Sequence, residues 1–177
     1  TGDTGGTCGV CRVFVTSTTY NGNLGGITGA NANCQGLAEA ASQPGIYKAW
    51  LSDDTGAPVN NFPCTAASCS AQGYTLVDGS TVVANDWVDL TTCEGPYPQE
   101  CLAHAIDMDE TGASVGLSAV WTNTVPDGNI SGASSCGNWS AAFGQSNAAG
   151  QSNLTNEWWT ELTQPLCSDS NRLYCFQ

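Results

Sequence analysis

The sequence predicts a mixed α+β fold, in which short strands and one main helix support a long loop region stapled by disulfides. The helix is expected near residues 29–42, because apolar residues from Cys34 to Ala41 recur at the spacing of one helical face. Alternating and β-branched runs predict short strands at both ends of the chain. The ten cysteines supply cross-links of the kind that long loops in a compact domain need.

The first half of the chain carries a strand, the helix and a second strand. Apolar residues alternate in residues 11–16 (CRVFVT), as they do in a strand. Thr28 stands where a helix N-cap is expected, and Pro44–Gly45 ends the helix. Residues 47–53 (YKAWLSD) are rich in aromatic and apolar side chains, which predicts the second strand.

The second half is expected to consist of short strands joined by long loops. Residues 74–77 (YTLV) and 81–84 (TVVA) predict a hairpin around Asp78-Gly79, a dipeptide that favours a tight primed turn. Residues 117–122 (LSAVWT) and 172–176 (RLYCF) predict two further strands.

The length and charge of the chain limit what it binds. With 177 residues the chain fits one domain, and we expect a flexible N-terminal segment over residues 1–10 and the domain over 11–177. Three Lys and Arg residues stand against 16 Asp and Glu, which gives a net charge of −13. Because three cationic side chains cannot neutralise a phosphate backbone, nucleic acid is not expected as a partner. No apolar run is long enough to span a membrane, so membrane insertion is not expected either.

The cysteines indicate a compartment. Ten of them in an acidic, lysine-poor chain indicate an oxidising environment, because cytosolic thiols stay reduced. Their even number allows five disulfides, and the sequence alone leaves the connectivity open. We therefore expect a secreted or cell-surface protein.

Several motifs follow one another in an order that resembles a known family. They are VFVTSTTYNGNLGG, a helix that holds Cys34, KAWLSD, DWVDL, IDMDETG, VWTNT, CGNWSA and, near the end, LYCF. This series resembles the C-type-lectin-like fold, in particular the endostatin-like domains of bacterial secreted and lipoprotein surface proteins, over residues 13–177. The resemblance implies short antiparallel sheets whose first and last strands pair.

The resemblance also implies how the cysteines pair. It implies one bridge from the helix to the last strand, Cys34–Cys175, and one inside the loop region, Cys136–Cys167. Two further pairs would then cross-link local loops: Cys64 with Cys69, and Cys93 with Cys101. Cys8 and Cys11 remain, to pair with each other or with another chain.

An acidic run predicts a structural calcium site, and calcium is the one cofactor expected. Asp107, Asp109 and Glu110 lie in DMDETG, which has the spaced oxygens and the glycine of the first half of a calcium loop. The EF-hand pattern is not completed, because Ser118 stands at its twelfth position and has no carboxylate. An exposed acidic turn is the alternative.

The ligand surface is expected in the loop region 93–160. Sugar-binding relatives use Glu-Pro-Asn or Gln-Pro-Asp and Trp-Asn-Asp triplets; the nearest here are VPD (125–127) and NWS (138–140), and both depart from the pattern. Adjacent residues on a strand face opposite ways, so one of the two neighbouring tryptophans is expected at the surface. The predicted ligand-binding residues are Asp127, Asn129, Asn138, Trp158 and Trp159.

Other motifs carry less specific predictions. Glycosylation sequons begin at Asn129, Asn138 and Asn153 and matter only in a host that glycosylates. His104 is the only histidine, and without a Gly-x-Ser-x-Gly elbow we expect it to be a surface or packing residue. The remaining tryptophans are expected in the core: Trp50, Trp87, Trp121 and Trp139.

These observations predict a non-catalytic extracellular recognition or adhesion module that binds a glycan or a protein through its loops. One alternative is a structural subunit of an extracellular filament or surface layer, in which copies of the chain bind one another. A secreted hydrolase is the weaker alternative, because no catalytic constellation stands out. Electron microscopy of the native material and a turnover screen separate the three.

Overall fold

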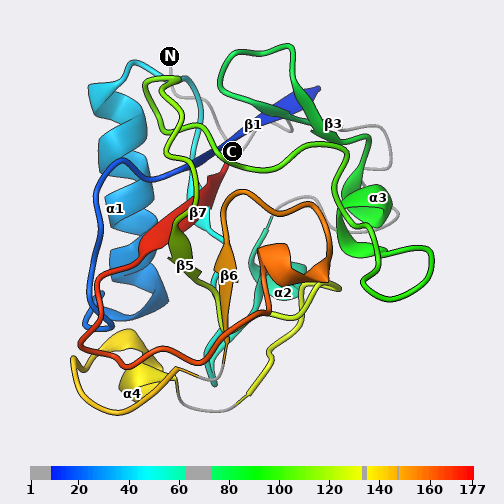
Figure 1. Ribbon diagram of the computed structural model, residues 1–177. Coiled ribbons are helices and arrows are strands. Elements are labelled where there is room, and N and C mark those ends of the chain that lie inside the picture. Colours follow the sequence, from blue (N-terminus) through cyan, green and yellow to red (C-terminus); the bar gives the residue numbers. More distant parts are fainter. Residues whose placement is uncertain (1–8, 63–72, 133–134, 147) are drawn as a thin grey trace.

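The computed structural model describes residues 9–62, 73–132, 135–146 and 148–177, and a mixed sheet runs through them (Figure 1). The sheet has seven strands within these ranges, in the order β4-β3-β1-β7-β5-β6, with β2 paired to β7. The strands are β1 (Val10–Val15), β2 (Lys48–Ala49), β3 (Gly73–Leu76), β4 (Val82–Ala84), β5 (Ala119–Trp121), β6 (Ala149–Gln151) and β7 (Arg172–Phe176). The helices are α1 (Gly26–Ala40), α2 (Pro58–Asn61), α3 (Trp87–Thr91), α4 (Cys136–Trp139) and the 3-10 turn η2 (Glu157–Trp159).

The first and last strands pair at the centre of the sheet, as expected. β1 runs antiparallel to β7, with Val13 opposite Phe176 and Val15 opposite Tyr174. The expectation of antiparallel sheets is wrong for two other pairs, since β1–β3 and β5–β7 are parallel. Parallel neighbours need a long crossover connection, and the chain between β1 and β3 provides one that includes α1 and β2. The fold is therefore α+β with a mixed sheet.

The two faces of the central strands bury different sets of side chains. Alternate residues of a strand point to opposite faces. On one face Val13 and Tyr174 join a core rich in tryptophan, and on the other Phe14 and Leu173 pack with Cys34 of α1. Figure 1 shows α1 along one side of the sheet with α4 at its lower end, and α2 and α3 on the other side. The four tryptophans expected in the core are buried: Trp50, Trp87, Trp121 and Trp139.

Helix α1 begins and ends on left-handed residues. Its N-cap is Gly25, with φ +80°, and no side chain caps the helix, so the expectation for Thr28 is wrong. At its C-terminus Ser42 adopts φ +58°, and Gln43 N–H donates to Ala38 O, which stops the helix at Ala40, two residues earlier than expected. Across the described ranges, no helix combines the length and the apolar character that crossing a membrane requires.

The β3–β4 hairpin forms as expected, but its turn is not the primed turn that Asp78-Gly79 favours. A primed two-residue turn of that type needs positive φ at both residues, and only Gly79 has it, at +73°. The Asp78 carboxylate instead accepts the N–H groups of Ser80 and Thr81, each at 2.9 Å. Hydrogen bonds, first from Thr81 and then from Ser80, hold the pKa of Asp78 well below its ordinary value.

Three of the expected disulfides are present in the described residues. Cys34–Cys175 joins α1 to β7 across 141 positions, Cys136–Cys167 spans 31, and Cys93–Cys101 closes a local loop of 8. Cys11 is also disulfide-bonded. The expected pairings that involve Cys8, Cys64 and Cys69 lie outside the described residues, as does most of the N-terminal segment. Disulfides of this number are typical of proteins that mature in an oxidising compartment.

Candidate ligand-binding surface

The loop region is anchored to the sheet by buried hydroxyl groups. The indole N–H of Trp50 donates to Thr160 Oγ1 at 2.8 Å, and this hydroxyl donates to the carbonyl of Thr124 at 2.8 Å. The Ser52 and Thr124 hydroxyls also share a hydrogen bond of 2.8 Å. Ser52, Thr124 and Thr160 are all fully buried. Their paired polar groups fix three distant segments to one another without exposing apolar surface.

Asn123 joins two further segments to this anchor. Its side-chain amide donates to Ser52 O at 3.1 Å and to Gly132 O at 2.7 Å, and its backbone is left-handed, with φ +46°. Asparagine tolerates this conformation better than most residues. The base of the loop region is therefore rigid and is built from polar side chains.

Asn138, one of the predicted ligand residues, lies in a left-handed turn. In α4, Cys136, Asn138 and Trp139 all have φ between +50° and +61°, as does Gly137. This conformation costs a non-glycine residue about 1–2 kcal/mol. The Trp139 indole, which donates to Ser52 O at 2.8 Å, and the Cys136 disulfide hold it in place. The Asn138 side chain itself accepts the Asp54 N–H at 3.4 Å.

The two neighbouring tryptophans separate as expected, but on a 3-10 turn and not on a strand. Trp159 is fully buried, with its ring 5.0 Å from that of Trp50 and 5.4 Å from that of Tyr174. It therefore belongs to the core, which corrects its place among the ligand-binding residues. Trp158 is only partly buried, and its ring lies 6.0 Å from that of Tyr97 at an angle of 78°.

Tyr97 was not singled out by any sequence pattern, and it is the more exposed member of this pair, at 77%. It lies in the loop closed by Cys93–Cys101, in which Glu94 and Glu100 exchange backbone hydrogen bonds of 2.8 and 3.0 Å. The loop is fastened to η2 because Glu157 N–H donates to Gln99 O at 3.1 Å. Both rings are thus presented by backbone that is cross-linked and hydrogen-bonded. We call the residues Glu94, Tyr97, Glu100, Glu157 and Trp158 the Tyr97–Trp158 surface.

The other predicted ligand residues and sequons lie elsewhere. Asp127 and Asn129 are exposed in a turn next to α2, where Val59 N–H donates to Gly128 O, and Asp127 accepts the Asn129 N–H. Of the sequon asparagines, Asn129 and Asn153 are exposed, whereas Asn138 is partly buried. The predicted ligand residues thus come from several segments, and none of the described contacts joins Asp127, Asn129 or Asn138 to Trp158.

The predicted calcium residues make bonds within the chain. Asp109 Oδ1 accepts the N–H groups of Thr111 at 2.9 Å and of Ala113 at 3.0 Å. The Glu110 carboxylate accepts the Ser17 N–H at 2.9 Å and the Ser17 hydroxyl. Burial, together with the charge of Glu110, raises the pKa of Tyr20. Within the described residues, no three His, Cys, Asp or Glu side chains are grouped as a metal site would group them. The calcium site stays a prediction.

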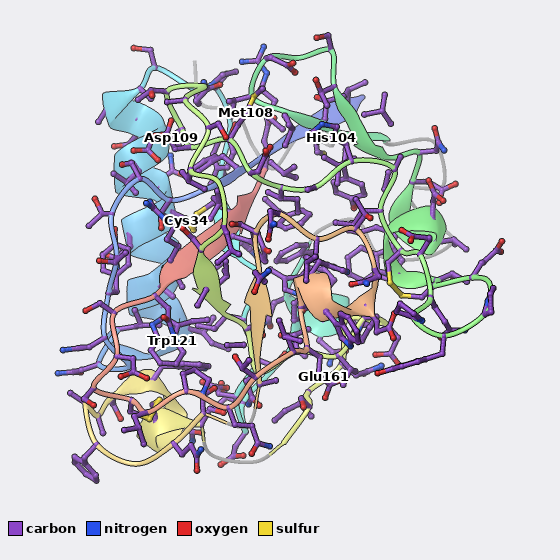
Figure 2. All side chains as sticks on the ribbon, viewed as in Figure 1. Cys34, His104, Met108, Asp109, Trp121 and Glu161 are labelled. Carbon is purple, nitrogen blue, oxygen red and sulfur yellow. A yellow bond between two sulfur atoms is a disulfide. The ribbon has the colours of Figure 1, made fainter. Side chains whose placement is uncertain are left out.

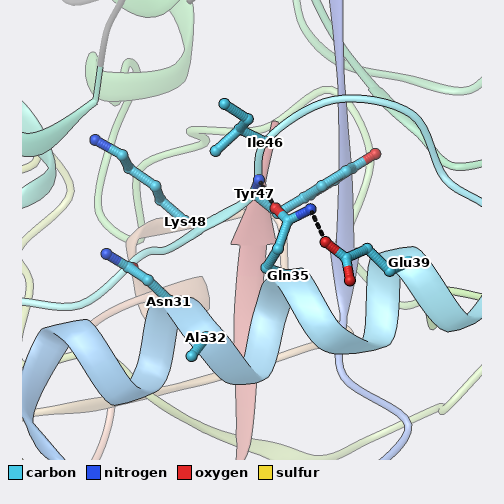
Figure 3. A pocket seen from close by; sticks show the side chains of 7 residues that line it. All are labelled: Asn31, Ala32, Gln35, Glu39, Ile46, Tyr47 and Lys48. Carbon is cyan, nitrogen blue, oxygen red and sulfur yellow. Dashed lines mark hydrogen bonds between the residues drawn. The ribbon is translucent and has the colours of Figure 1, made fainter. Parts of the chain in front are cut away.

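A depression of about 440 Å³ lies between α1 and the segment leading into β2, but its polar groups are already used (Figure 3). Gln35 Oε1 accepts the Tyr47 N–H at 2.8 Å, and Asn31 Oδ1 accepts the Ala49 N–H at 2.9 Å. The Lys48 ammonium donates to Asn61 O at 2.5 Å. The two amides therefore complete the hydrogen bonding of β2, and we interpret the depression as part of the helix–strand packing.

His104 and the cations are also accounted for by local structure. His104 is exposed, with Nδ1 2.8 Å from the carbonyl oxygen of Ala105; Figure 2 shows it near β3, far from Glu161. Arg12 donates to Gln43 Oε1 at 2.9 Å, and Arg172 donates to Ser17 O at 2.6 Å. Together with Lys48, all three cations of the sequence thus bond to neutral oxygen atoms of their own chain.

The Tyr97–Trp158 surface combines one exposed and one partly buried aromatic ring with carboxylates on a rigid support, an arrangement suited to holding a ligand by ring contact and charge. The signal that points to it in the sequence is the pair Cys93 and Cys101, which brackets Tyr97 in a short loop. No protein-family model matches the chain, and no curated protein matches its sequence.

Proposed function

We propose that this protein is a secreted, non-catalytic recognition module with a C-type-lectin-like fold that binds a glycan or a protein on the Tyr97–Trp158 surface. The observation that carries the proposal is the aromatic pair itself: a tyrosine that is 77% exposed, with its ring 6.0 Å from a partly buried tryptophan. Exposed large aromatic side chains on a fixed loop are frequent ligand contacts.

The lectin-like fold is supported by three features that the resemblance implied. They are the pairing of β1 with β7, the bridge from α1 to β7, and the bridge between Cys136 and Cys167. The disulfides support secretion, because such bonds persist outside the cytosol.

A binding screen tests the function. The intact protein is applied to an array of glycans and extracellular proteins, together with Tyr97→Ala and Trp158→Ala. We expect at least one ligand that the wild type retains and both variants lose. Phe143→Ala is the matched control, because Phe143 is 80% exposed but lies in a different loop. A ligand bound equally by all four proteins would place the binding surface elsewhere.

The same preparation is screened for hydrolysis of polysaccharides and peptides. The expected result is no turnover above background. Turnover by the wild type that is lost in His104→Ala would show that the protein is an enzyme and would overturn the proposal.

A further inference from the structure

We infer that the Tyr97–Trp158 surface binds the ammonium group of a lysine side chain in a basic polypeptide. This inference rests on the proposed function of the surface and names the class of its ligand. Three properties of the surface support it. They are the angle between the rings, the carboxylates near them, and the fact that the described contacts of these carboxylates include no Lys or Arg side chain.

The angle between the rings favours an ammonium group over a sugar ring. At 78° the two rings are nearly perpendicular and form two walls of a corner. A pyranose lies flat on one aromatic face, whereas an ammonium ion is attracted to the faces of several rings that surround it. A lysine also places this charge at the end of an apolar stem that can pack along the walls.

Two glutamates stand opposite each other across the loop that carries Tyr97. Glu94 and Glu100 form an antiparallel bridge and exchange both backbone hydrogen bonds, so their side chains lie on the same face. Like charges directly opposite each other repel and destabilise such a pair. The Cys93–Cys101 bridge keeps them together, and the Glu100 carboxylate has only the Thr155 hydroxyl, at 2.9 Å, as a described partner. A cation bound here would relieve the repulsion.

A third carboxylate has an oxygen atom without any partner. Glu157 precedes Trp158 in η2, and its Oε2 atom is shielded from solvent and accepts no hydrogen bond. A shielded carboxylate oxygen loses its interactions with water and, unless a donor replaces them, is costly. The backbone of Glu157 is fixed, because its N–H donates to Gln99 O. Glu157 is itself only partly buried, so a turn of its side chain would bring this oxygen to the surface, where an ammonium group is a donor of the required charge.

The charge of the whole chain favours a basic polypeptide as the source of the lysine. With a net charge of −13, the protein attracts cationic partners over long range. Its own three cations are bonded to neutral oxygen atoms at other places. A basic segment of another protein therefore meets an acidic surface whose aromatic corner accepts one of its lysines.

Fluorescence anisotropy with a labelled synthetic peptide of alternating lysine and glycine tests the inference. The matched peptide has glutamine in place of lysine, and a chitosan oligomer tests whether an amino sugar serves as well. At physiological salt the Debye length is about 8 Å, so distant charges are screened. Under these conditions we expect the lysine peptide to bind at least tenfold more tightly than the glutamine peptide or the chitosan oligomer. Trp158→Ala and Glu157→Gln should each weaken it by roughly tenfold.

Two variants control for charge and for folding. Glu39→Gln removes the same charge from α1, far along the chain from the surface, and should change the affinity less than about twofold. Tyr97→Ala repeats the ring test at a side chain exposed enough to be removed without harm to the core, with the Tm as the check.

The outcomes separate the inference from the proposed function. If Glu39→Gln weakens the peptide as much as Glu157→Gln does, the binding is unspecific and the inference is overturned. If no peptide binds while Trp158→Ala abolishes a neutral glycan hit on the array, the inference fails and the proposed function stands. Tighter binding of the chitosan oligomer likewise overturns the polypeptide ligand. If the aromatic variants change nothing in either assay, both fail.

Discussion

The central sheet with α1 and the loop region behind it are stabilised in different ways. In the first region, alternate side chains of β1 and β7 fill two apolar cores, and one disulfide joins the helix to the last strand. In the second, fully buried hydroxyl and amide groups of Ser52, Asn123 and Thr160 connect segments that have little regular structure. Apolar packing tolerates small shifts, whereas a polar network must be completely bonded to be stable. We therefore expect the loop region to be more sensitive than the sheet region to the loss of a single side-chain group.

Removal of disulfides should have the largest effect and should differ between the regions. The chain-entropy model gives about 5 kcal/mol for Cys34–Cys175 and about 2.5 kcal/mol for Cys93–Cys101, because the closed loops differ in length. Urea unfolding of C34A/C175A and C93A/C101A measures both losses. The second variant should keep the near-UV circular dichroism of the core and lose ligand binding. Equal losses of free energy would contradict the comparison.

A single hydroxyl tests the polar network. Thr160→Val keeps the shape of the side chain but leaves the Trp50 indole N–H and the Thr124 carbonyl without their partner. We expect the free energy of unfolding to fall by about 1–3 kcal/mol. Thr163→Val is the control, since Thr163 is exposed and is expected to change stability by less than about 0.5 kcal/mol. Similar losses in both variants would show that the buried hydroxyls contribute little.

The first region contains a buried hydroxyl that should be dispensable. Tyr47 OH is shielded and has no hydrogen-bond partner, and its ring packs 5.2 Å from that of Phe14. Tyr47→Phe should therefore raise the free energy of unfolding by about 1 kcal/mol at neutral pH. A loss of stability would indicate that this region too depends on its polar groups.

The same variant should change the response to alkali. Burial raises the pKa of Tyr47 to about 12, above the value near 10 of an unfolded chain. The neutral hydroxyl is thus favoured in the folded state, so stability is constant below about pH 10 and falls as pH rises toward 12, by at most about 1.4 kcal/mol per pH unit for each such tyrosine. Tyr47→Phe should reduce this slope. Burial also raises the pKa of Tyr74 to about 12. Tyr74→Phe should therefore reduce the same slope, without a change in the free energy of unfolding at neutral pH.

Calcium is expected to have the smallest effect. Asp109 and Glu110 already accept hydrogen bonds from Thr111, Ala113 and Ser17, so an ion would have to replace some of these bonds. We predict a rise in Tm of no more than a few degrees at millimolar calcium, reversed by chelator and absent in Asp107→Asn. A Tm that does not change with calcium or chelator would show that DMDETG is an acidic turn without a bound ion.

The contrast between the regions also explains what could be predicted from the sequence. The strands β1, β5 and β7 were predicted correctly because their short runs of apolar, β-branched and aromatic residues are typical of buried strands. The left-handed turn of α4 could not be predicted, because a cross-link and the Trp139 indole bond impose it against the preference of Cys136 and Trp139. Tyr97 was missed for a similar reason: only the tertiary structure brings its loop to Trp158.

The position of β7 has a consequence for how the chain folds. β7 lies between β1 and β5, and Arg12 bonds to a residue 165 positions later. Contacts between such distant segments close large loops and slow the search for the native state. During synthesis or refolding, the centre of the sheet stays open until the five-residue strand β7 arrives, and the edges of β1 and β5 that pair with it stay unpaired until then. A chain shortened before Arg172 should collapse without a partner for Cys34 and should be prone to aggregate.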